Sequence, residues 1–279
     1  FPLEQEDDFL LPEGQVIAQK DKEALWRQRR SSKAMIKLID DQIGEILRLL
    51  EKRGMMEDTL VLFTSDHGDM LGDHYLLQKG VPWRQAVNVP LAIRLPGAEP
   101  TGENPYPVEL SDLAATILDY AGLDARQALS RSWPAYNDII PSRSLLPVLR
   151  GEADRCRDFC FAESDFTEER VQGIPVTDTP YWRGAGGRRS NAWQAIITEK
   201  SKYIKYLGYA LGEKPYEEFY DLRNDPMETA NLIGDPAYSD QIELARNRLS
   251  YMVDHHPAAQ KTWCTACARD REKAAEASS

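Results

Sequence analysis

A helix is the first element that the pattern of apolar positions predicts. Apolar residues recur at steps of three and four along one stretch, at Ile36, Ile39, Ile43, Ile46, Leu47 and Leu50. This spacing gives a helix one continuous apolar face, which we expect to pack against a sheet. Ser31 or Ser32 can cap the start of this helix and Gly54 can end it, so residues 1–30 are predicted to be an irregular lead-in.

Two short apolar runs predict strands at residues 59–64 and 91–95, and a helix is predicted at about 110–121. An uninterrupted apolar run is typical of a strand that is buried on both faces, as in a parallel sheet. The alternating order of helices and strands favours the α/β class. Residues 1–150 are therefore predicted to contribute part of a mostly parallel, doubly wound sheet.

Residues 151–255 carry a different pattern. Short segments rich in aromatic and β-branched residues predict strands, at 159–162, 195–198, 203–206 and 218–221, and an apolar-periodic helix follows near 239–253. Such an order is typical of a small α+β subdomain with an antiparallel sheet. Residues 166–192 join aromatic residues to arginines, which suits either recognition of an anionic or sugar group or a solvated insertion. Residues 256–279 are predicted to be a tail.

Composition narrows the range of partners. The 279 residues carry a net charge of −11, which argues against nucleic-acid binding through a basic surface. No apolar stretch approaches the roughly 18 residues that a membrane span requires. Cysteine spacing leaves disulfides, free thiols and a zinc site with neighbouring histidines all open, at Cys156, Cys160, Cys264, Cys267, His255 and His256.

Candidate chemistry follows the first predicted strand. Asp66 and His67 come directly after it, Gly68 supplies a turn, and Lys79 lies thirteen positions after Asp66. Ligands of open α/β sheets bind beyond the carboxyl ends of strands. A carboxylate and an imidazole can share a divalent metal there, and a lysine can bind an oxyanion. The alternative is an aspartate that caps the next helix, with the histidine hydrogen-bonded beside it.

Three further polar residues lie close to this pair. Asp69 and Asp73 are expected to order the turn rather than to bind metal, since short carboxylates cap backbone N–H groups readily. His74 follows Gly72, and it is expected either to line the substrate side of the site or to support it from behind.

Several motifs agree in order and spacing with one family. They are Ser65–His74, Lys79, Pro82–Trp83 and Val89–Gly97, with further matches at Asp40–Gly44, Asp112–Asp119, Ser144–Gly151, Lys202–Tyr206 and Phe219–Leu232. Together these segments resemble the sulfatase family of the alkaline phosphatase superfamily over about residues 30–235. The resemblance implies the alkaline-phosphatase-like fold for the α/β part of the chain.

The resemblance also implies roles for individual residues. Asp66 and His67 match the ligands of a divalent cation, for which Ca²⁺ is expected and Mg²⁺, Mn²⁺ or Zn²⁺ are alternatives. Lys79 matches the catalytic and substrate-binding lysine that contacts a sulfate ester near its leaving oxygen, and His74 is a second candidate for substrate binding. The implied substrate is a sulfated small molecule or carbohydrate.

Part of the family pattern is missing from this chain. Family members carry a Cys/Ser-x-Pro-x-Arg motif whose first residue becomes formylglycine, and no cysteine or serine here begins such a motif. The formylglycine is therefore not in this chain. We expect the chain to be the C-terminal portion of a sulfatase-like enzyme, to need the missing N-terminal half as a partner, and to be inactive in isolation.

Three other functions remain open. A phosphonate or phosphate-diester hydrolase of the same superfamily uses a similar site. A phosphoethanolamine transferase is less favoured, since those enzymes commonly present histidine where this chain has Lys79. A non-catalytic module, or the complementing half of a split enzyme, belongs to a different class. Such a truncated sheet would expose an apolar surface that the absent half normally covers.

Overall fold

The computed structural model describes residues 19–98, 102–132, 142–166, 191–207 and 216–255. These residues fall into two compact units. The first unit contains residues 19–79 and 83–98, and the second contains residues 80–82 and the described residues from 102 onward. The boundary predicted at residue 150 falls inside the second unit. Among the described residues, no helix is both long enough and apolar enough to cross a membrane.

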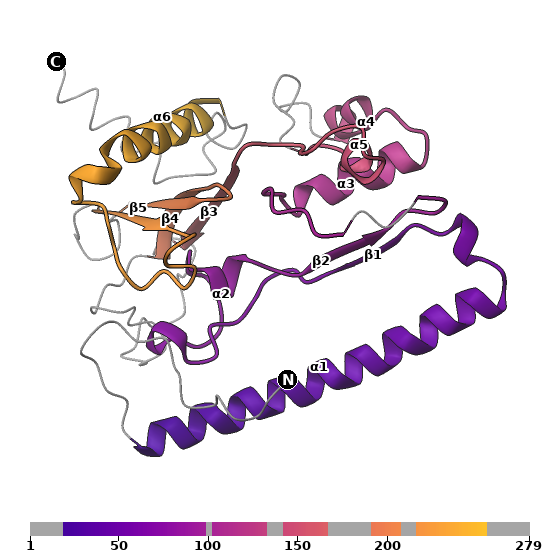
Figure 1. Ribbon diagram of the computed structural model, residues 1–279, viewed down its shortest axis with the longest axis horizontal. Helices are drawn as coiled ribbons and strands as arrows, with labels where there is room; N and C mark the ends of the chain where they lie inside the picture. The colour runs from indigo at the N-terminus through magenta and orange to yellow at the C-terminus, as the bar shows by residue number, and fades with distance from the viewer. Residues whose placement is uncertain (1–18, 99–101, 133–141, 167–190, 208–215, 256–279) are drawn as a thin grey trace. The chain divides into compact units, whose positions relative to one another are not determined.

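The first unit consists mainly of one long helix and a strand pair, shown in indigo to purple in Figure 1. Its elements are α1 (Gln19–Lys52), η1 (Met56–Asp58), β1 (Val61–Thr64), η2 (Asp73–Tyr75), α2 (Arg84–Val87) and β2 (Leu91–Arg94).

The start of α1 differs from the prediction, whereas its end agrees. The helix is already formed at Gln19, well before Ser31. Ser31 lies inside the helix, where its hydroxyl donates to the carbonyl of Arg27 at 3.0 Å instead of capping the first turn. Gly54 has a φ of 66°, a left-handed conformation that glycine adopts without strain, and its N–H donates to the carbonyl of Glu51 at 2.9 Å.

The apolar face of α1 is not packed against a sheet within the described residues. Ile36, Ile39 and Ile46 are 63%, 54% and 58% exposed, so the packing predicted for them is wrong for this structure. Phe63 of β1 is also 41% exposed. The physical reason is the size of the sheet in this unit, because two four-residue strands cannot cover a 34-residue helix.

Strands β1 and β2 pair antiparallel, with Val61 opposite Arg94 and Thr64 opposite Leu91. The sequence pattern predicted mostly parallel strands here, and this pairing corrects that expectation for these two strands. A parallel neighbour needs a crossover connection that returns the chain to the same edge, usually a helix of several turns. The connection between β1 and β2 contains only η2 and the four-residue α2, so the chain reverses and comes back antiparallel.

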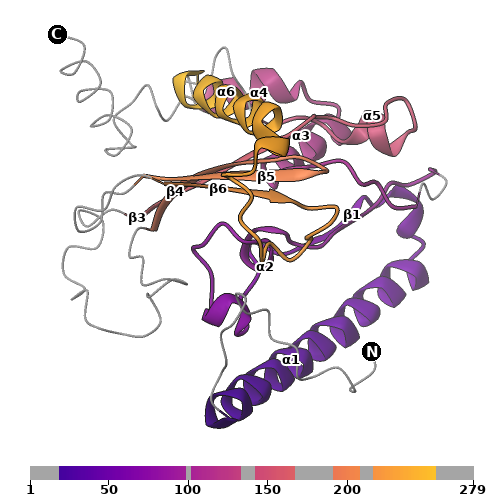
Figure 2. The same cartoon turned by 60° about the vertical axis from the view of Figure 1, so that its left-hand side comes forward.

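The second unit contains a four-stranded sheet and several helices. Its elements are α3 (Ser111–Tyr120), α4 (Ala125–Ser132), α5 (Leu146–Leu149), β3 (Cys160–Phe166), β4 (Asn191–Ile197), β5 (Ser201–Tyr206), β6 (Tyr216–Asp221), η6 (Pro236–Tyr238) and α6 (Ser239–His255). The strands form an antiparallel sheet in the order β3-β4-β5-β6, which confirms the antiparallel sheet predicted for this part of the chain. Figure 2 shows α6 lying along one face of this sheet.

Packing between α6 and the sheet forms the core of the second unit. Ile196, Tyr203 and Phe219 come from three adjacent strands and are at most 1% exposed. They meet Ile242, Ala245 and Leu249, whose spacing of three and four residues puts them on one face of α6. The predicted periodicity of this helix is thereby explained.

A buried ion-pair network ties the region before β3 to α3. The carboxylate of Asp112 is fully buried, accepts from the Nε of Arg157 at 3.0 Å, and accepts from the backbone N–H groups of Glu109 and Arg143 at 2.8 Å each. Arg157 also contacts Glu109 at 2.8 Å. Burial raises the pKa of Glu109, and the guanidinium of Arg157 opposes this shift. Charges can be buried when they are paired and hydrogen-bonded in this way.

The cysteines within the described residues are free thiols. Cys156 is half-buried, Cys160 is buried, and the two do not form a disulfide. Burial raises the pKa of the Cys160 thiol well above its usual value, which keeps that thiol protonated and unreactive. Cys264, Cys267 and His256 lie outside the described residues, as does the loop predicted at 166–192 for most of its length.

Candidate active-site loop

Asp66 and His67 converge directly after β1. The Nε2 of His67 lies 3.4 Å from Oδ2 of Asp66, and the backbone N–H of His67 donates to Oδ1 of Asp66 at 3.0 Å. The Nδ1 of His67 lies 2.8 Å from the carbonyl oxygen of Gly68. A carbonyl only accepts hydrogen bonds, so Nδ1 is the donor in this contact, and the ring is turned with Nε2 toward Asp66. Metal-binding histidines are commonly oriented by such a bond.

The pair fits part of a metal site. A carboxylate oxygen and an imidazole nitrogen close together are a donor set that divalent cations accept, without distinguishing among them. Within the part of the chain that the structure describes, no group of three or more histidine, cysteine, aspartate or glutamate residues is arranged to hold an ion. Asp66 and His67 therefore fit two positions of a coordination sphere that needs further ligands.

Gly68 allows the loop to approach α2 closely. A Cβ atom at this position would lie 1.9 Å from the carbonyl oxygen of Gln85, which no side chain can tolerate. The N–H of Gly68 donates to the carbonyl of Ala86 at 2.8 Å. The glycine is thus required for this close approach, a requirement that the sequence pattern identified only as a turn.

Asp69 closes the loop that leads to Lys79. Its Oδ1 accepts from the backbone N–H groups of Leu71 at 2.9 Å and Gln78 at 3.0 Å. The N–H of Met70 donates to the carbonyl of Gln78 at 2.8 Å. The two ends of the loop are therefore held together, and the predicted turn-ordering role of Asp69 is confirmed. Lys79, the next residue, is exposed.

Asp73 is held by two side chains that sequence reasoning did not assign to the site. Its Oδ1 lies 2.5 Å from a terminal nitrogen of Arg29, and its Oδ2 accepts from the Nε2 of Gln85 at 3.2 Å. The Nε of Arg29 also donates to the carbonyl of Leu71 at 2.8 Å. Arg29 was missed because it lies 44 positions before Asp73, in a stretch predicted to be irregular. Asp73 therefore contacts side chains of α1 and α2, and its predicted capping of the turn stays a prediction.

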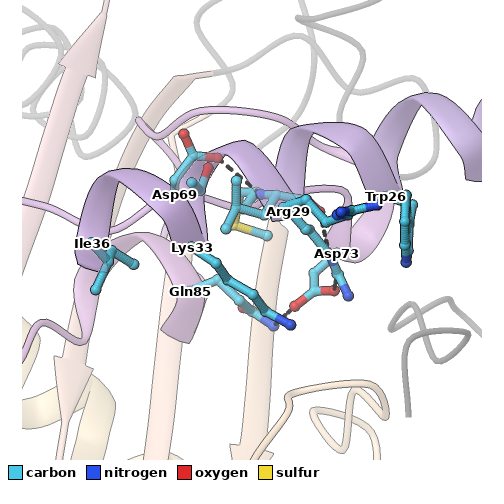
Figure 3. A pocket seen from close by; sticks show the side chains of 11 residues that line it. Trp26, Arg29, Lys33, Ile36, Asp69, Asp73 and Gln85 are labelled. Carbon is cyan, nitrogen blue, oxygen red and sulfur yellow. Dashed lines mark hydrogen bonds and ion pairs between the residues drawn. The ribbon is translucent and has the colours of Figure 1, made fainter. Parts of the chain in front are cut away.

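A pocket of about 400 Å³ lies between α1 and this loop. Figure 3 shows Trp26, Arg29 and Lys33 of α1 together with Asp73 and Gln85, which come from the loop and from α2. The other lining residues are Arg30, Ser32, Ile36, Asp69, Met70 and Leu71. Asp66, His67, His74 and Lys79 are not part of the lining, so the pocket lies beside the predicted site residues and does not join them.

His74 is buried behind the loop. It is 4% exposed, and its ring stacks on Trp83 with centroids 4.6 Å apart and planes inclined by 5°. His74 has a φ of 52°, an uncommon conformation for a residue with a side chain. This position suits a residue that supports the loop from inside, and the predicted contact between His74 and a substrate stays a prediction.

Comparison with known proteins identifies the family. Residues 4–123 match the Sulfatase family. The chain is 29% identical over 233 residues to an arylsulfatase of Clostridium perfringens, covering 82% of this chain and 40% of that relative. It is 28% identical over 214 residues to a choline-sulfatase of Rhizobium meliloti, covering 77% of this chain and 35% of the relative.

Solved structures agree with the sequence matches. The phosphonate monoester hydrolase of Agrobacterium radiobacter superposes with a TM-score of 0.60 at 30% identity, covering 84% of this chain and 43% of that one. The chain therefore belongs to the sulfatase/alkaline phosphatase superfamily, and its α/β fold class is confirmed. It spans 35–40% of the length of the two curated relatives.

Proposed function

We propose that the intact protein is a metal-dependent hydrolase of sulfate monoesters and that this chain supplies part of its active site. The observation that carries the proposal is the convergence of Asp66 and His67, with Oδ2 and Nε2 3.4 Å apart at the end of β1. The match to the Sulfatase family and the arylsulfatase relative support the reading of the substrate as a sulfate ester. A sulfated small molecule or carbohydrate is the substrate class that we propose.

Each residue has a distinct part in this proposal. Asp66 and His67 would hold a divalent cation, with Ca²⁺ as the proposed ion, and the bound ion would stabilise negative charge on the sulfate oxygens. Lys79 would bind the ester and neutralise the charge that develops on the departing alcohol oxygen. His74, stacked on Trp83, would support the loop that carries both functions.

The nucleophile of the reaction is proposed to come from outside this chain. No serine or cysteine in the 279 residues begins the sequence that precedes formylglycine in the family. The missing part would also supply the further metal ligands that Asp66 and His67 need. On this reasoning the chain by itself binds the cation weakly and does not turn over substrate.

Hydrolysis of phosphonate monoesters is the second candidate function. The 30% identity to the phosphonate monoester hydrolase of Agrobacterium radiobacter favours it as an alternative. A phosphonate monoester and a sulfate monoester are both tetrahedral monoanions that present anionic oxygens to a cation and a lysine, so the residues of this chain suit either substrate. The distinction depends on how well the site accommodates the charge and substituents of each ester.

A substrate panel tests the proposal. The intact enzyme, loaded with Ca²⁺, is assayed against p-nitrophenyl sulfate, p-nitrophenyl phenylphosphonate and bis-p-nitrophenyl phosphate. These esters share one leaving group, so the comparison isolates the transferred group. We expect the highest kcat/KM for the sulfate ester. A higher kcat/KM for the phosphonate would assign the second function, and no hydrolysis of any of the three by the loaded enzyme would favour a non-catalytic module.

A further inference from the structure

The three residues that follow Lys79 are hydrogen-bonded to the four-stranded sheet. The indole Nε1 of Trp193, on β4, donates to the carbonyl of Gly80 at 2.9 Å. The Nζ of Lys202, on β5, donates to the carbonyl of Pro82 at 2.9 Å. Gly80–Pro82 accordingly belong to the same compact unit as the sheet. Two side chains from neighbouring strands thus hold both ends of this short segment.

Both donors lie on the face of the sheet opposite to α6. Ile196 and Tyr203, which pair with each other, point toward α6 in the core. Side chains alternate between the two faces along a strand, so Lys202, next to Tyr203, points the other way. Trp193 is three positions before Ile196 and also lies on that face. The side of the sheet that α6 leaves uncovered is therefore the side that holds Gly80–Pro82.

Lys202 is a buried charge held by a buried carboxylate. The side chain of Lys202 is 3% exposed and forms an ion pair with Glu228, whose side chain is fully buried. Burying an ammonium group is strongly unfavourable unless it is paired and hydrogen-bonded. The Pro82 carbonyl is a third polar group in this arrangement, and Pro82 itself is fully buried. These contacts fix the position of the Pro82 carbonyl relative to β5.

The backbone conformation points to the same two regions. Among the described residues, those other than glycine with a positive φ are Leu71, His74, Gln78 and Glu228. Three of them lie in the loop before Lys79, and the fourth is the partner of Lys202. Residues with side chains adopt this conformation at a cost, and they keep it where the surrounding contacts fix it. The loop before Lys79 is therefore constrained by its surroundings. So is Glu228, which pairs with the lysine that donates to Pro82.

We propose that Trp193 and Lys202 are positioning residues for Lys79. This inference rests on the proposed function, in which Lys79 contacts the leaving oxygen. Asp69 fixes the backbone at Gln78, immediately before Lys79, and Trp193 fixes the carbonyl of Gly80, immediately after it. With the backbone held on both sides, the ammonium group samples a smaller volume, which favours the orientation that the reaction needs.

A double-mutant cycle in the intact enzyme tests this proposal. Trp193→Phe keeps an aromatic ring and removes the N–H that donates to Gly80. We expect it to lower kcat about 10-fold for sulfate esters of poor leaving groups and far less for good ones, since a part-buried hydrogen bond is lost only at the segment that orients Lys79. In a Lys79→Ala background, the same change should lower kcat by less than about 2-fold, because a positioning effect disappears with the group that it positions.

Tyr220→Phe is the matched control on the same sheet face. It removes a buried hydroxyl that donates to Glu218 at 3.0 Å and leaves the Gly80 contact intact. We expect kcat, KM and the leaving-group dependence to match those of the unmodified enzyme. A loss from Trp193→Phe that is equal in both backgrounds, or that is equal for good and poor leaving groups, would overturn the positioning role.

Hydrogen exchange supplies a readout that does not depend on turnover. Trp193→Phe should speed amide exchange in the peptide that spans residues 76–83, and Tyr220→Phe should not. An unchanged exchange rate in Trp193→Phe overturns the proposal. If Lys79→Ala leaves hydrolysis unchanged, the proposed function of Lys79 fails and its positioning fails with it. An impaired Lys79→Ala beside an unaffected Trp193→Phe overturns the positioning role alone.

Discussion

The Nε2 of His67 and Oδ2 of Asp66 lie 3.4 Å apart, while Nδ1 of the same ring faces the carbonyl of Gly68 at 2.8 Å. The imidazole is therefore oriented by the backbone and turned toward the carboxylate. If the two atoms bind one cation, removal of either side chain should weaken the affinity for that ion.

Asp66→Ala should weaken divalent-metal binding by the intact enzyme. We expect a loss of affinity at least as large as the roughly 10–100-fold that loss of an outer-shell partner costs, because Asp66 is proposed to be a direct ligand. The measurement is metal content after dialysis against graded chelator. Asp69→Asn is the control, since its amide oxygen can still accept from Leu71 and Gln78. Equal metal content in Asp66→Ala and the unmodified enzyme would refute the assignment.

Lys79→Ala should impair the hydrolysis of esters with poor leaving groups most. Removing one group that stabilises developing charge typically costs about 10²–10³ in kcat. The steepness of log kcat against leaving-group pKa should therefore increase. Lys200→Ala, a change at another exposed lysine, should leave this slope unchanged. If all esters lose the same factor, Lys79 contributes to binding and not to departure of the alcohol.

Gly68→Ala should disrupt the loop. The added methyl group would lie 1.9 Å from the carbonyl oxygen of Gln85, and relief of this overlap requires a backbone shift that typically costs about 1–3 kcal/mol. We expect a lower thermal midpoint and weaker metal binding together. Gly234→Ala is the matched control, because an added Cβ there meets no atom within 4 Å. Comparable behaviour of the two variants would exclude the close approach as the reason for Gly68.

Asp112→Ala should destabilise the second unit. Breaking a buried ion pair typically costs about 3–5 kcal/mol, and here Arg157 loses Asp112 while it keeps its contact with Glu109. Urea unfolding of the intact enzyme measures this change. Asp158→Ala removes a carboxylate from an exposed pair with Arg155 and should change the free energy of unfolding by less than about 0.5 kcal/mol. A small effect of Asp112→Ala would mean that water reaches the site.

The exposed apolar face of α1 should be covered in the intact enzyme. Ile39, 54% exposed in this structure, is expected to pack against the missing part, where a buried isoleucine contributes about 1.5–3 kcal/mol. Ile39→Glu should therefore lower the stability of the intact enzyme and reduce self-association of the isolated chain in sedimentation experiments. Glu51→Gln on the same helix should do neither. Unchanged stability of the intact enzyme with Ile39→Glu would contradict the coverage.

The local sequence pattern was sufficient to predict several parts of the fold. The spacing of Ile242, Ala245 and Leu249 specifies the buried face of α6, and the conformation of Gly54 ends α1 where the sequence predicts. The approach of His67 to Asp66 was predictable because adjacent residues after a strand need no long-range information to meet. Periodicity, helix ends and contacts between adjacent side chains are all properties of a few neighbouring residues.

Contacts between residues far apart in the sequence could not be predicted from local patterns. The bond between Trp193 and Gly80 joins residues 113 positions apart, and the bond between Lys202 and Pro82 spans 120 positions. The prediction of parallel strands was wrong for a related reason. The direction in which β1 pairs with β2 depends on the path of the whole connection between them. The prediction that Ile39 is buried was wrong because periodicity shows which face of a helix is apolar and not what covers that face.

The affiliation of Gly80–Pro82 with the four-stranded sheet limits how this protein can be divided. A shorter protein that starts at residue 102 would retain every strand of the sheet and all of α6. It would nevertheless lack the carbonyl oxygens of Gly80 and Pro82, so the indole N–H of Trp193 and the ammonium of Lys202 would each lose an acceptor inside a buried face. Division of the chain before residue 102 would thus leave the core between the sheet and α6 intact and remove two acceptors from the opposite face of the sheet. A three-residue segment far away in the sequence thus supplies hydrogen-bond acceptors to buried side chains on that face of the sheet.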